Sequence, residues 1–225
     1  MVCNVLIHGF GGCPKELKHL NAYLLQRGLV TYIITLAGHG GTKRDLHKTS
    51  YKDWLKSAHA EVAQLVGRYD KVNLIGFSMG GLICVRLAQK FKINRIVLIN
   101  TPVFFWNIPL ITKRIFKDLL GGKRDNINYF LKSTFRVSLK SSIDFLKILF
   151  TTLPTLKHIR NKTLILQCLD DETVYYRSAF YLKRVLGKKA KLHLFKGGCH
   201  LVFVNDIILR DKYNECVYKF VKDVH

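Results

Sequence analysis

The sequence has few acidic residues for its length, no apolar run long enough to cross a membrane and no paired-cysteine motif. It holds 15 Asp and Glu against 37 Lys and Arg, which gives a formal net charge of +22 at pH 7. A field of this sign attracts nucleic acid, anionic lipid surfaces and acidic substrates without specificity. The basic residues are spread along the chain, without an Arg-rich arm, zinc-finger spacing or a groove-reading helix. We therefore expect no specific nucleic-acid partner and only weak association with anionic lipid surfaces.

The cysteines show no framework pattern. Six are present without CxxC spacing, and no basic, apolar leader precedes the first motif. No apolar run approaches the roughly 20 residues that a membrane span needs. These absences predict a soluble, cytoplasmic protein with free thiols. A length of 225 residues fits one domain whose core can hold a sheet covered on both faces, so we expect a single domain over residues 1–225.

Short runs rich in Val, Ile and Leu alternate with amphipathic helical stretches. This alternation is typical of βαβ units and predicts an α/β fold with a mainly parallel sheet of about six strands and helices on both faces. The expected strands span residues 2–7, 29–35, 71–75, 95–99, 163–168 and 191–195. The expected helices span residues 14–27, 50–66 and 81–91, and Ser50 with Asp53 forms the N-terminal cap of the second.

The alternation stops after Thr101 and Pro102. Residues 103–152 show helical periodicity without a strand pattern, and they carry nine Lys and Arg against three Asp. An insertion between two strands is where a lid or cap would lie. We therefore predict a helical cap insertion over residues 103–152. Its apolar start includes Phe105 and Trp106, which we expect either to line a substrate pocket or to pack the cap onto the domain.

The sequence from Gly76 to Gly80 reads G-x-S-x-G and lies between an expected strand and an expected helix. A nucleophile on such a sharp turn adopts strained backbone angles, and the flanking glycines let neighbouring backbone approach without Cβ clashes. The helix N-terminus behind the serine also favours negative charge that develops near it. Ser78 is therefore the candidate nucleophile.

A serine hydroxyl needs a general base, and the base needs a carboxylate that orients it. The last expected strand is followed by a glycine-rich loop that delivers His200, whereas His193 lies within that strand and is interpreted as structural. The preceding expected strand runs directly into Asp170, Asp171 and Glu172. Three carboxylates therefore compete to orient His200.

The loop after the first expected strand reads HGFGG over residues 8–12. Glycines let a backbone turn its N–H groups toward a pocket, and the oxyanion of an acyl-transfer intermediate needs such preorganised donors. We predict the N–H groups of Phe10 and Met79 as these donors. His8, at the strand end, and His39, in a glycine-rich turn, are interpreted as structural, and lining of the site is the alternative for His39.

Together these motifs resemble the bacterial carboxylesterase and monoacylglycerol lipase group of α/β-hydrolases. The resemblance spans nearly the whole chain and rests on HGFGG at residues 8–12, GHG at 38–40, GFSMGG at 76–81, DETV at 171–174 and GCH at 198–200. It implies an α/β-hydrolase fold with a small helical cap. It also implies that Asp171 is the acid of a triad with Ser78 and His200, because the family's acid stands shortly before an apolar residue. The same resemblance implies oxyanion donors at Phe10 and Met79.

The expected activity is hydrolysis of carboxylic esters, namely short-to-medium acyl esters or monoacylglycerols, through an acyl-enzyme on Ser78. This chemistry requires no metal and no organic cofactor. Three alternatives stay open: a thioesterase or other acyl-transfer hydrolase, a serine peptidase or amidase, and a catalytically silent hydrolase fold that serves as a binding module. A triad does not distinguish a thioesterase from an esterase, and the sequence indicates no oligomeric state.

Overall fold

The strands form where the alternation of the sequence predicts them. The structure is a computed structural model that describes residues 1–104, 138–205 and 207–222. The strands are β1 (Val2–Ile7), β2 (Val30–Ile34), β3 (Lys71–Phe77), β4 (Arg95–Ile99), β5 (Lys162–Cys168) and β6 (Ala190–Phe195). They join in a 6-stranded sheet of order β2-β1-β3-β4-β5-β6, in which every neighbouring pair is parallel. The predicted α/β fold with a mainly parallel sheet is thereby confirmed.

The chain changes direction across the sheet after β2. It moves from β1 to the neighbouring β2 and then crosses to the other side of β1 to form β3. Open parallel sheets bind ligands at the carboxyl ends of the strands, at such a switch point. The HGFGG loop follows β1 and the turn at Ser78 follows β3, so both motifs leave the sheet at this point.

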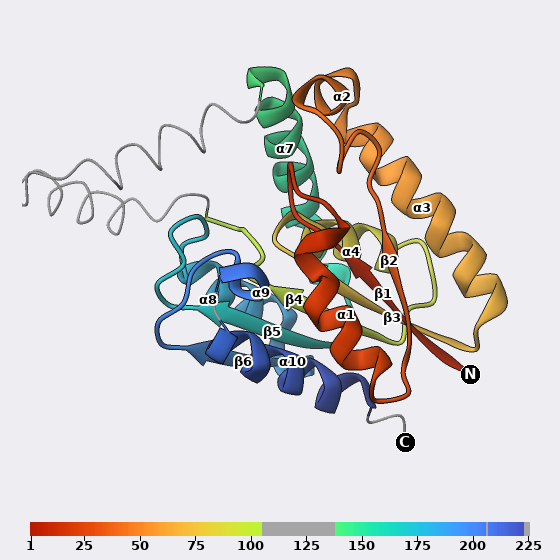
Figure 1. The fold of residues 1–225 in the computed structure, drawn as a ribbon, viewed down its shortest axis with the longest axis vertical. Coiled ribbons are helices and arrows are strands. Elements are labelled where there is room, and N and C mark those ends of the chain that lie inside the picture. Colours follow the sequence, from red (N-terminus) through yellow and green to blue (C-terminus); the bar gives the residue numbers. More distant parts are fainter. Residues whose placement is uncertain (105–137, 206, 223–225) are drawn as a thin grey trace, which may run out of the picture.

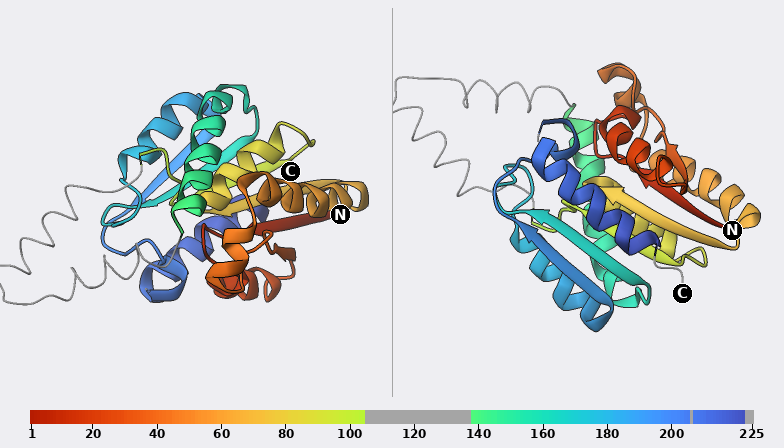
Figure 2. Two further views of the ribbon diagram at one scale, coloured as in Figure 1. Left: turned by 90° about the horizontal axis from the view of Figure 1, so that it is seen from above. Right: turned by 60° about the horizontal axis from the view of Figure 1, so that its bottom comes forward.

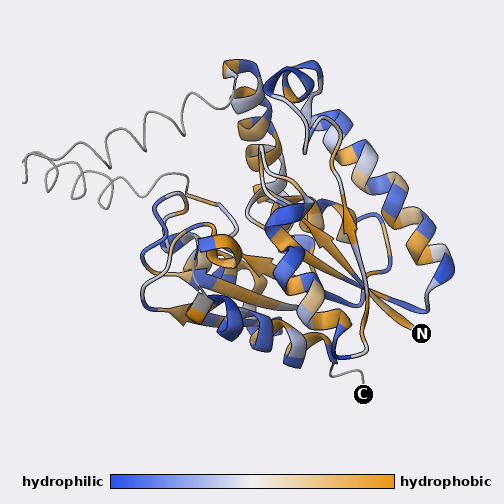
Figure 3. Cartoon of the chain, viewed as in Figure 1, coloured by the Kyte–Doolittle hydropathy of each residue, from blue (hydrophilic) through white to orange (hydrophobic). Residues whose placement is uncertain are grey.

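Helices cover both faces of the sheet (Figures 1 and 2). They are α1 (Lys18–Leu25), α2 (Lys43–Lys48), α3 (Tyr51–Arg68), α4 (Met79–Ala88), α7 (Leu139–Thr152), α8 (Arg177–Leu186), α9 (Val202–Asn205), α10 (Ile207–Lys222) and the 3-10 helices η1 (Pro14–Leu17), η2 (Leu153–His158) and η3 (Gly187–Lys189). Side chains of α1, α9 and α10 pack on one face, and those of α3, α4, α7 and α8 pack on the other. Figure 3 shows hydrophobic residues along the strands and many hydrophilic residues on α3.

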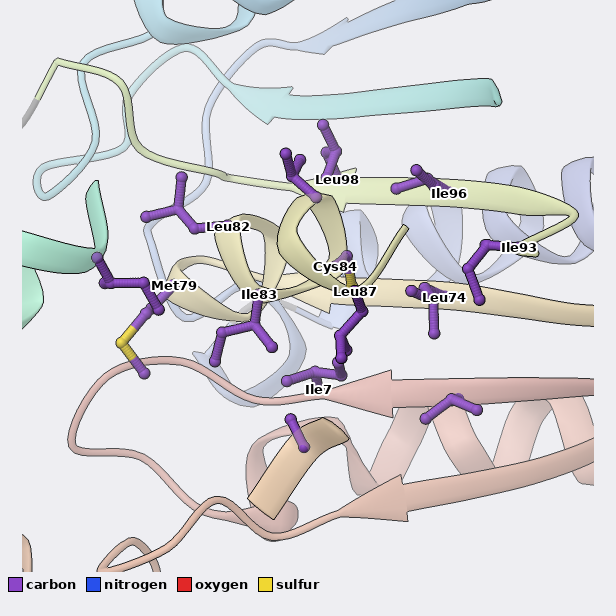
Figure 4. Close-up of a cluster of buried hydrophobic side chains, with 14 of the residues drawn as sticks. Ile7, Leu74, Met79, Leu82, Ile83, Cys84, Leu87, Ile93, Ile96 and Leu98 are labelled. Carbon is purple, nitrogen blue, oxygen red and sulfur yellow. The ribbon is translucent and has the colours of Figure 1, made fainter. Parts of the chain in front are cut away.

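Successive strand residues alternate between two hydrophobic cores. Val5 belongs to the core that includes α4, whereas Leu6 belongs to the core that includes α10, because neighbouring side chains of a strand point to opposite faces. Strands β3 and β4 are buried on both faces, which explains the continuous apolar run Ile96–Ile99 of β4, whereas β3 also buries the polar Asn73. Figure 4 shows Leu82 of α4 near Leu98 of β4 and Leu87 near Leu74 of β3. This packing fixes α4 and therefore the turn that precedes it.

The helix starts agree with the sequence in one case and differ in another. Asp53 Oδ2 accepts hydrogen bonds from the Ser50 N–H at 2.9 Å and the Ser50 hydroxyl at 2.7 Å, which completes the cap predicted for α3. Helix α4 begins at Met79, two residues before the expected start at residue 81. The reason is that the helix follows the sharp turn of Ser78 directly, with no intervening loop.

The predicted cap lies only partly within the described residues. Residues 105–137, which include Phe105 and Trp106, lie outside them. The described part of the insertion ends in α7, which packs on α2, α3 and α4. Figure 1 shows α7 beside α2, where Lys140 Nζ donates to the main-chain oxygen atoms of His47 and Thr49, both at 2.7 Å. Helix α7 is thus part of the helix layer on this face of the sheet.

Among the residues that the structure describes, no helix combines the length and apolarity needed to cross a membrane. The same residues contain no group of three or more His, Cys, Asp or Glu side chains placed to hold a metal ion.

Candidate active site

Ser78 lies on a strained turn between β3 and α4. Its backbone has φ 53° and ψ −123°, a combination that costs free energy for a residue with a Cβ atom. The Ser78 N–H donates to Ile99 O at 2.8 Å, which ties the turn to β4. A Cβ on Gly76 would overlap the backbone of Gly80, and a Cβ on Gly80 would overlap the backbone of Ile7. The two glycines of the motif are therefore required by packing around the serine.

Loops after β6 and β5 bring His200 and Asp171 to Ser78. His200 Nε2 lies 3.0 Å from Ser78 Oγ. His200 Nδ1 lies 2.8 Å from Asp171 Oδ2. Ser78 and His200 are 8% and 9% exposed, and Asp171 is fully buried. Residues up to 122 positions apart in the sequence thus form one chain of hydrogen bonds, from hydroxyl to imidazole to carboxylate.

Backbone donors hold the carboxylate of Asp171 in place. Its Oδ1 accepts hydrogen bonds from the N–H groups of Thr173 and Val174, both at 2.8 Å. Gln167 Nε2 lies 3.5 Å from Oδ2 and makes a weaker contact. These donors leave Oδ2 directed at the imidazole, so the orientation of the carboxylate is set before any substrate binds.

The two neighbouring carboxylates lie in different surroundings. Asp170 is exposed. Glu172 accepts the main-chain N–H of His200 at 3.2 Å and therefore contacts the backbone of the histidine loop. Of the three carboxylates that the sequence offers after β5, Asp171 is the one hydrogen-bonded to the His200 ring.

The electrostatic surroundings of His200 favour its protonated form. Burial lowers the pKa of the imidazole, but the charge and hydrogen bond of Asp171 raise it, and the charges of Glu172 and Glu16 act in the same direction. The carboxylates prevail, so the pKa of His200 lies above its ordinary value. These carboxylates therefore stabilise the imidazolium that forms when His200 accepts a proton.

The HGFGG loop lies against the serine turn. A Cβ added to Gly9 would come 3.2 Å from Ser78 Cβ, so this part of the loop is in close contact with the nucleophile. Gly11 has φ 65°, a conformation that favours glycine. Met79 is the first residue of α4, and an N–H at that position has no acceptor within its own helix. Phe10 belongs to this loop and Met79 directly follows Ser78, and their N–H groups stay a prediction as the two oxyanion donors.

Both histidines near this loop have structural contacts. His8 is fully buried, and its Nε2 accepts the Leu36 N–H at 3.2 Å. Burial lowers the pKa of His8 to about 4, so the ring is neutral at pH 7, as an accepting nitrogen requires. His39 Nδ1 lies 3.0 Å from Ala37 O, and burial lowers the pKa of this ring as well. The structural interpretation thus fits both residues. His193, the third histidine interpreted as structural, is exposed on β6.

Aromatic side chains form a wall beside the HGFGG loop. The ring of Phe10 stacks on Phe145 of α7 at a centroid distance of 5.2 Å and an interplanar angle of 22°. Trp54 of α3 lies 5.6 Å from the Phe10 ring, and His39 lies 5.2 Å from the Trp54 ring. Phe145 is 3% exposed and Trp54 is fully buried. Helix α7 therefore contacts the HGFGG loop through Phe145.

Asn100 is a site residue that the sequence analysis missed. It follows β4, is fully buried and has φ 46°. Its Nδ2 donates to the main-chain oxygen of His200 at 3.1 Å, and its Oδ1 accepts the Cys168 N–H at 3.2 Å and the Tyr213 hydroxyl at 3.1 Å. An asparagine after a strand is an ordinary turn residue, so no local pattern distinguishes it.

Glu16 is a second missed residue. It lies on η1, and its Oε2 accepts the Gly9 N–H at 3.4 Å. Its carboxylate also occupies the space beside Gly12, where a Cβ would overlap it. Burial raises the pKa of Glu16, while the Gly9 N–H and the charge of His200 oppose that rise. The residue thus connects the HGFGG loop to the electrostatics of the histidine.

A parallel sheet that presents a serine on a strand-to-helix turn, followed in the chain by a carboxylate and then a histidine, defines the α/β-hydrolase class. The model of the alpha/beta hydrolase fold family matches residues 5–146. The chain belongs to this family. The family predicted from the motifs is confirmed.

Two curated relatives carry the names that the motif resemblance implies. A thermostable monoacylglycerol lipase of Bacillus sp. strain H-257 is 32% identical over 108 residues, which cover 48% of this chain and 42% of that protein. A carboxylesterase of Bacillus subtilis strain 168 is 21% identical over 226 residues, which cover 97% of this chain and 91% of that protein. The expected class of enzyme, a carboxylic ester hydrolase, is thus the class of both relatives.

Solved structures show the same fold at low identity. A structure from work on the metagenome-derived lipolytic enzymes LipS and LipT has a TM-score of 0.78 at 19% identity and covers 98% of this chain and 93% of its own. A soluble variant of monoglyceride lipase from Saccharomyces cerevisiae has a TM-score of 0.76 at 18% identity, with 97% and 85% covered. A bromoperoxidase from Bacillus anthracis also matches, with a TM-score of 0.71 at 21% identity and 98% and 92% covered. These similarities show the fold, and the activity has to be argued from the site.

Proposed function

We propose that this chain is a serine carboxylesterase that hydrolyses carboxylic esters through an acyl-enzyme intermediate on Ser78. The observation that carries the proposal is the chain of hydrogen bonds from Ser78 Oγ to His200 Nε2 at 3.0 Å and from His200 Nδ1 to Asp171 Oδ2 at 2.8 Å. A serine hydroxyl becomes a nucleophile when a neighbouring base accepts its proton. This geometry supplies both the base and the group that orients it.

In the first step Ser78 Oγ attacks the ester carbonyl while His200 Nε2 accepts the hydroxyl proton. Asp171 holds the Nδ1–H and stabilises the imidazolium that forms. His200 then donates the proton to the departing alcohol, which leaves the acyl group on Ser78. In the second step the same imidazole takes a proton from water, whose oxygen attacks the acyl carbonyl. The bond between Ser78 Oγ and the acyl carbon then breaks, the acid leaves, and His200 returns the proton to Ser78 Oγ.

The oxyanion formed in each step accepts hydrogen bonds from the N–H groups of Phe10 and Met79. These donors come from the loop after β1 and from the first residue of α4. A backbone donor of this kind lowers a barrier by about 3 kcal/mol, because it is aimed at the charge before the charge develops. The N-terminus of α4 adds a favourable dipole.

The substrates that we propose are short-to-medium acyl esters or monoacylglycerols. The support is Phe10, a partly buried apolar side chain of the loop that contacts Ser78, whose ring packs against the buried rings of Trp54 and Phe145. The names of the two curated relatives, monoacylglycerol lipase and carboxylesterase, point to the same classes. We further propose that residues 103–152 form a cap that sets substrate choice, with Phe105 and Trp106 as part of the pocket.

The state of the cysteines supports a location in the reducing cytoplasm. None of the six cysteines, all of which lie in the described part of the chain, forms a disulfide. Burial raises the pKa of Cys3 to about 11 and that of Cys168 to about 12, so these thiols stay protonated and unreactive near neutral pH. We therefore propose that the enzyme functions without disulfides.

A fluorophosphonate probe tests the proposal directly, because it forms a covalent adduct with an activated serine. We expect labelling of the wild-type chain at Ser78, no labelling of Ser78→Ala, and full labelling of the control Ser142→Ala on α7. Hydrolysis of p-nitrophenyl esters should follow the same pattern. An unlabelled wild-type chain would indicate a silent binding module. A matched pair of an ester and a thioester with one acyl group separates the two hydrolase activities.

A further inference from the structure

A pocket lies at the amino ends of β3, β4 and β5, at the opposite edge of the sheet from Ser78. Figure 4 shows Ile93 at this end and Met79 at the other. The pocket has a volume of about 360 Å³. Its polar lining consists of four cationic side chains and two amides: Lys71, Arg95, Arg160, Lys162, Asn94 and Asn161. No acidic side chain lines it among the described residues.

Arg95 is the buried member of this lining. It is 8% exposed, and its guanidinium donates to Phe220 O and lies 5.3 Å from the Phe220 ring. Among the ion pairs of residues 1–104, 138–205 and 207–222, none includes Arg95. Asp70, next to Lys71 in the sequence, pairs with the amino group of Met1. A buried charge is stabilised by a counter-ion, so an anion in the pocket would interact favourably with this guanidinium.

The sheet register places two of these cations side by side. Arg95 on β4 is the direct partner of Lys162 on β5. Like charges that lie directly opposite each other on neighbouring strands destabilise the pair. An anion bound between Arg95 and Lys162 would attract both side chains and offset their mutual repulsion.

The two amides of the pocket are held in fixed positions. Asn94 Nδ2 donates to Asn73 Oδ1 at 2.8 Å, and Asn73 Nδ2 donates to Asn4 Oδ1 at 2.9 Å. Asn4 and Asn73 are buried in the sheet, so this ladder of amides anchors Asn94 from inside the fold. Asn161 Nδ2 donates to Ile93 O at 2.5 Å. The two amides are thus fixed in the lining beside the buried Arg95, while Lys71, Arg160 and Lys162 are exposed at its edge.

We propose that this pocket binds a small phosphorylated ligand, with Arg95 and Lys162 as the principal contacts and Lys71 and Arg160 at the rim. A guanidinium presents its donors as a planar fork that matches two phosphate oxygens. Four cations suit a multiply charged anion, and the volume of about 360 Å³ admits more than a single phosphate group. The site lies apart from Ser78 and is independent of the ester hydrolase proposal.

Titration calorimetry with pyrophosphate, at physiological salt to screen non-specific attraction, tests this site. We expect one saturable site per chain in the wild type. Arg160→Gln with Lys162→Gln should weaken binding at least about tenfold, because it removes two charge-assisted contacts. The control is Arg44→Gln with Lys48→Gln on α2, which removes the same two charges from exposed positions at the other end of the molecule. We expect the control to bind within about twofold of the wild type.

Three results would overturn the proposal: no saturable binding of pyrophosphate, equal weakening in both double variants, or a stoichiometry well above one. Arg95→Gln should also abolish binding, and the double variant decides the question if that chain does not fold. Vesicles of phosphatidylglycerol form the second arm. If they displace pyrophosphate, the source of the phosphate is a lipid headgroup; if they do not, it is a free ligand. Activity toward p-nitrophenyl esters in the double variants shows that the active site is intact.

Discussion

Asn100 and His200, which lie 100 residues apart in the sequence, are joined by a hydrogen bond of 3.1 Å from Asn100 Nδ2 to the main-chain oxygen of His200. The same amide accepts hydrogen bonds from the backbone of β5 and from Tyr213 of α10. The loop that carries His200, the proposed base, is therefore held by the side chain of Asn100, which directly follows β4. This relationship gives Asn100 a positioning role that acts through His200.

Asn100→Gly accepts the positive φ but removes the amide, so it tests the hydrogen bonds apart from backbone strain. We expect kcat to fall about 10- to 100-fold with KM nearly unchanged, because His200 loses its position while the aromatic side chains beside the HGFGG loop stay in place. Asn100→Asp places an oxygen against His200 O and should also lower kcat. Steady-state kinetics and thermal unfolding measure both effects. A wild-type kcat in a folded Asn100→Gly chain would contradict the positioning role.

Asp171→Asn should reduce kcat by a factor on the order of 10³ to 10⁴, since an amide at this place favours the wrong histidine tautomer. The Thr173 and Val174 N–H groups hold Oδ1, so the new NH₂ group would face His200. Asp170→Asn is the matched control at an exposed neighbour, and we expect activity within about twofold of the wild type. Kinetics on one p-nitrophenyl ester compare the two. The opposite ranking would move the role to Asp170.

Glu16→Gln should shift the acid limb of the pH profile of kcat/KM to lower pH. The base must be neutral to act, so activity rises with pH through the pKa of His200. Burial lowers that pKa, and Asp171, Glu172 and Glu16 raise it. Removing the charge of Glu16 therefore lowers the pKa of His200. Glu61→Gln on α3 is the control and should leave the profile in place. A shift to higher pH, or none, would count against Glu16.

Phe145→Leu should change the ranking of p-nitrophenyl esters by acyl length, because it removes the ring that stacks on Phe10 while keeping an apolar side chain. Each methylene of the acyl chain in an apolar pocket is worth roughly 1 to 3 kcal/mol of discrimination. Phe150→Leu, on the exposed side of α7 at 64% exposure, is the control. Identical rankings in both variants would mean that Phe145 serves packing alone.

Esters carried by anionic vesicles should be hydrolysed faster at low salt than esters on neutral vesicles, and added salt should remove the difference. The physical reason is the net charge of +22, whose attraction for anionic surfaces is screened over about 10 Å at moderate ionic strength. Turnover on vesicles of matched ester content measures the effect. Equal turnover on anionic and neutral vesicles at low salt would show that the net charge of the protein does not affect its access to the substrate.

The sequence by itself determined the strands, the order in which they alternate with helices, and the place of Ser78. These features are local. Burial on both faces of β4 favours its continuous run of Ile, Val and Leu, and the turn at Ser78 requires Gly76 and Gly80, whose missing Cβ atoms make room for backbone. A pattern within a few residues is enough to express such requirements, so it can be recognised without neighbours from elsewhere in the chain.

The family resemblance pointed to Asp171, but only the tertiary structure shows why this carboxylate is the one that reaches His200. Asp170, Asp171 and Glu172 are adjacent and chemically alike, and successive residues after a strand point in different directions. The pairing of β5 with β6 sets the height and rotation of the two loops, and that register directs Asp171 to the ring while Asp170 faces solvent. Asn100 and Glu16 were missed for the same reason. Each acts across a contact between elements far apart in the chain, and such contacts exist only once the sheet has assembled.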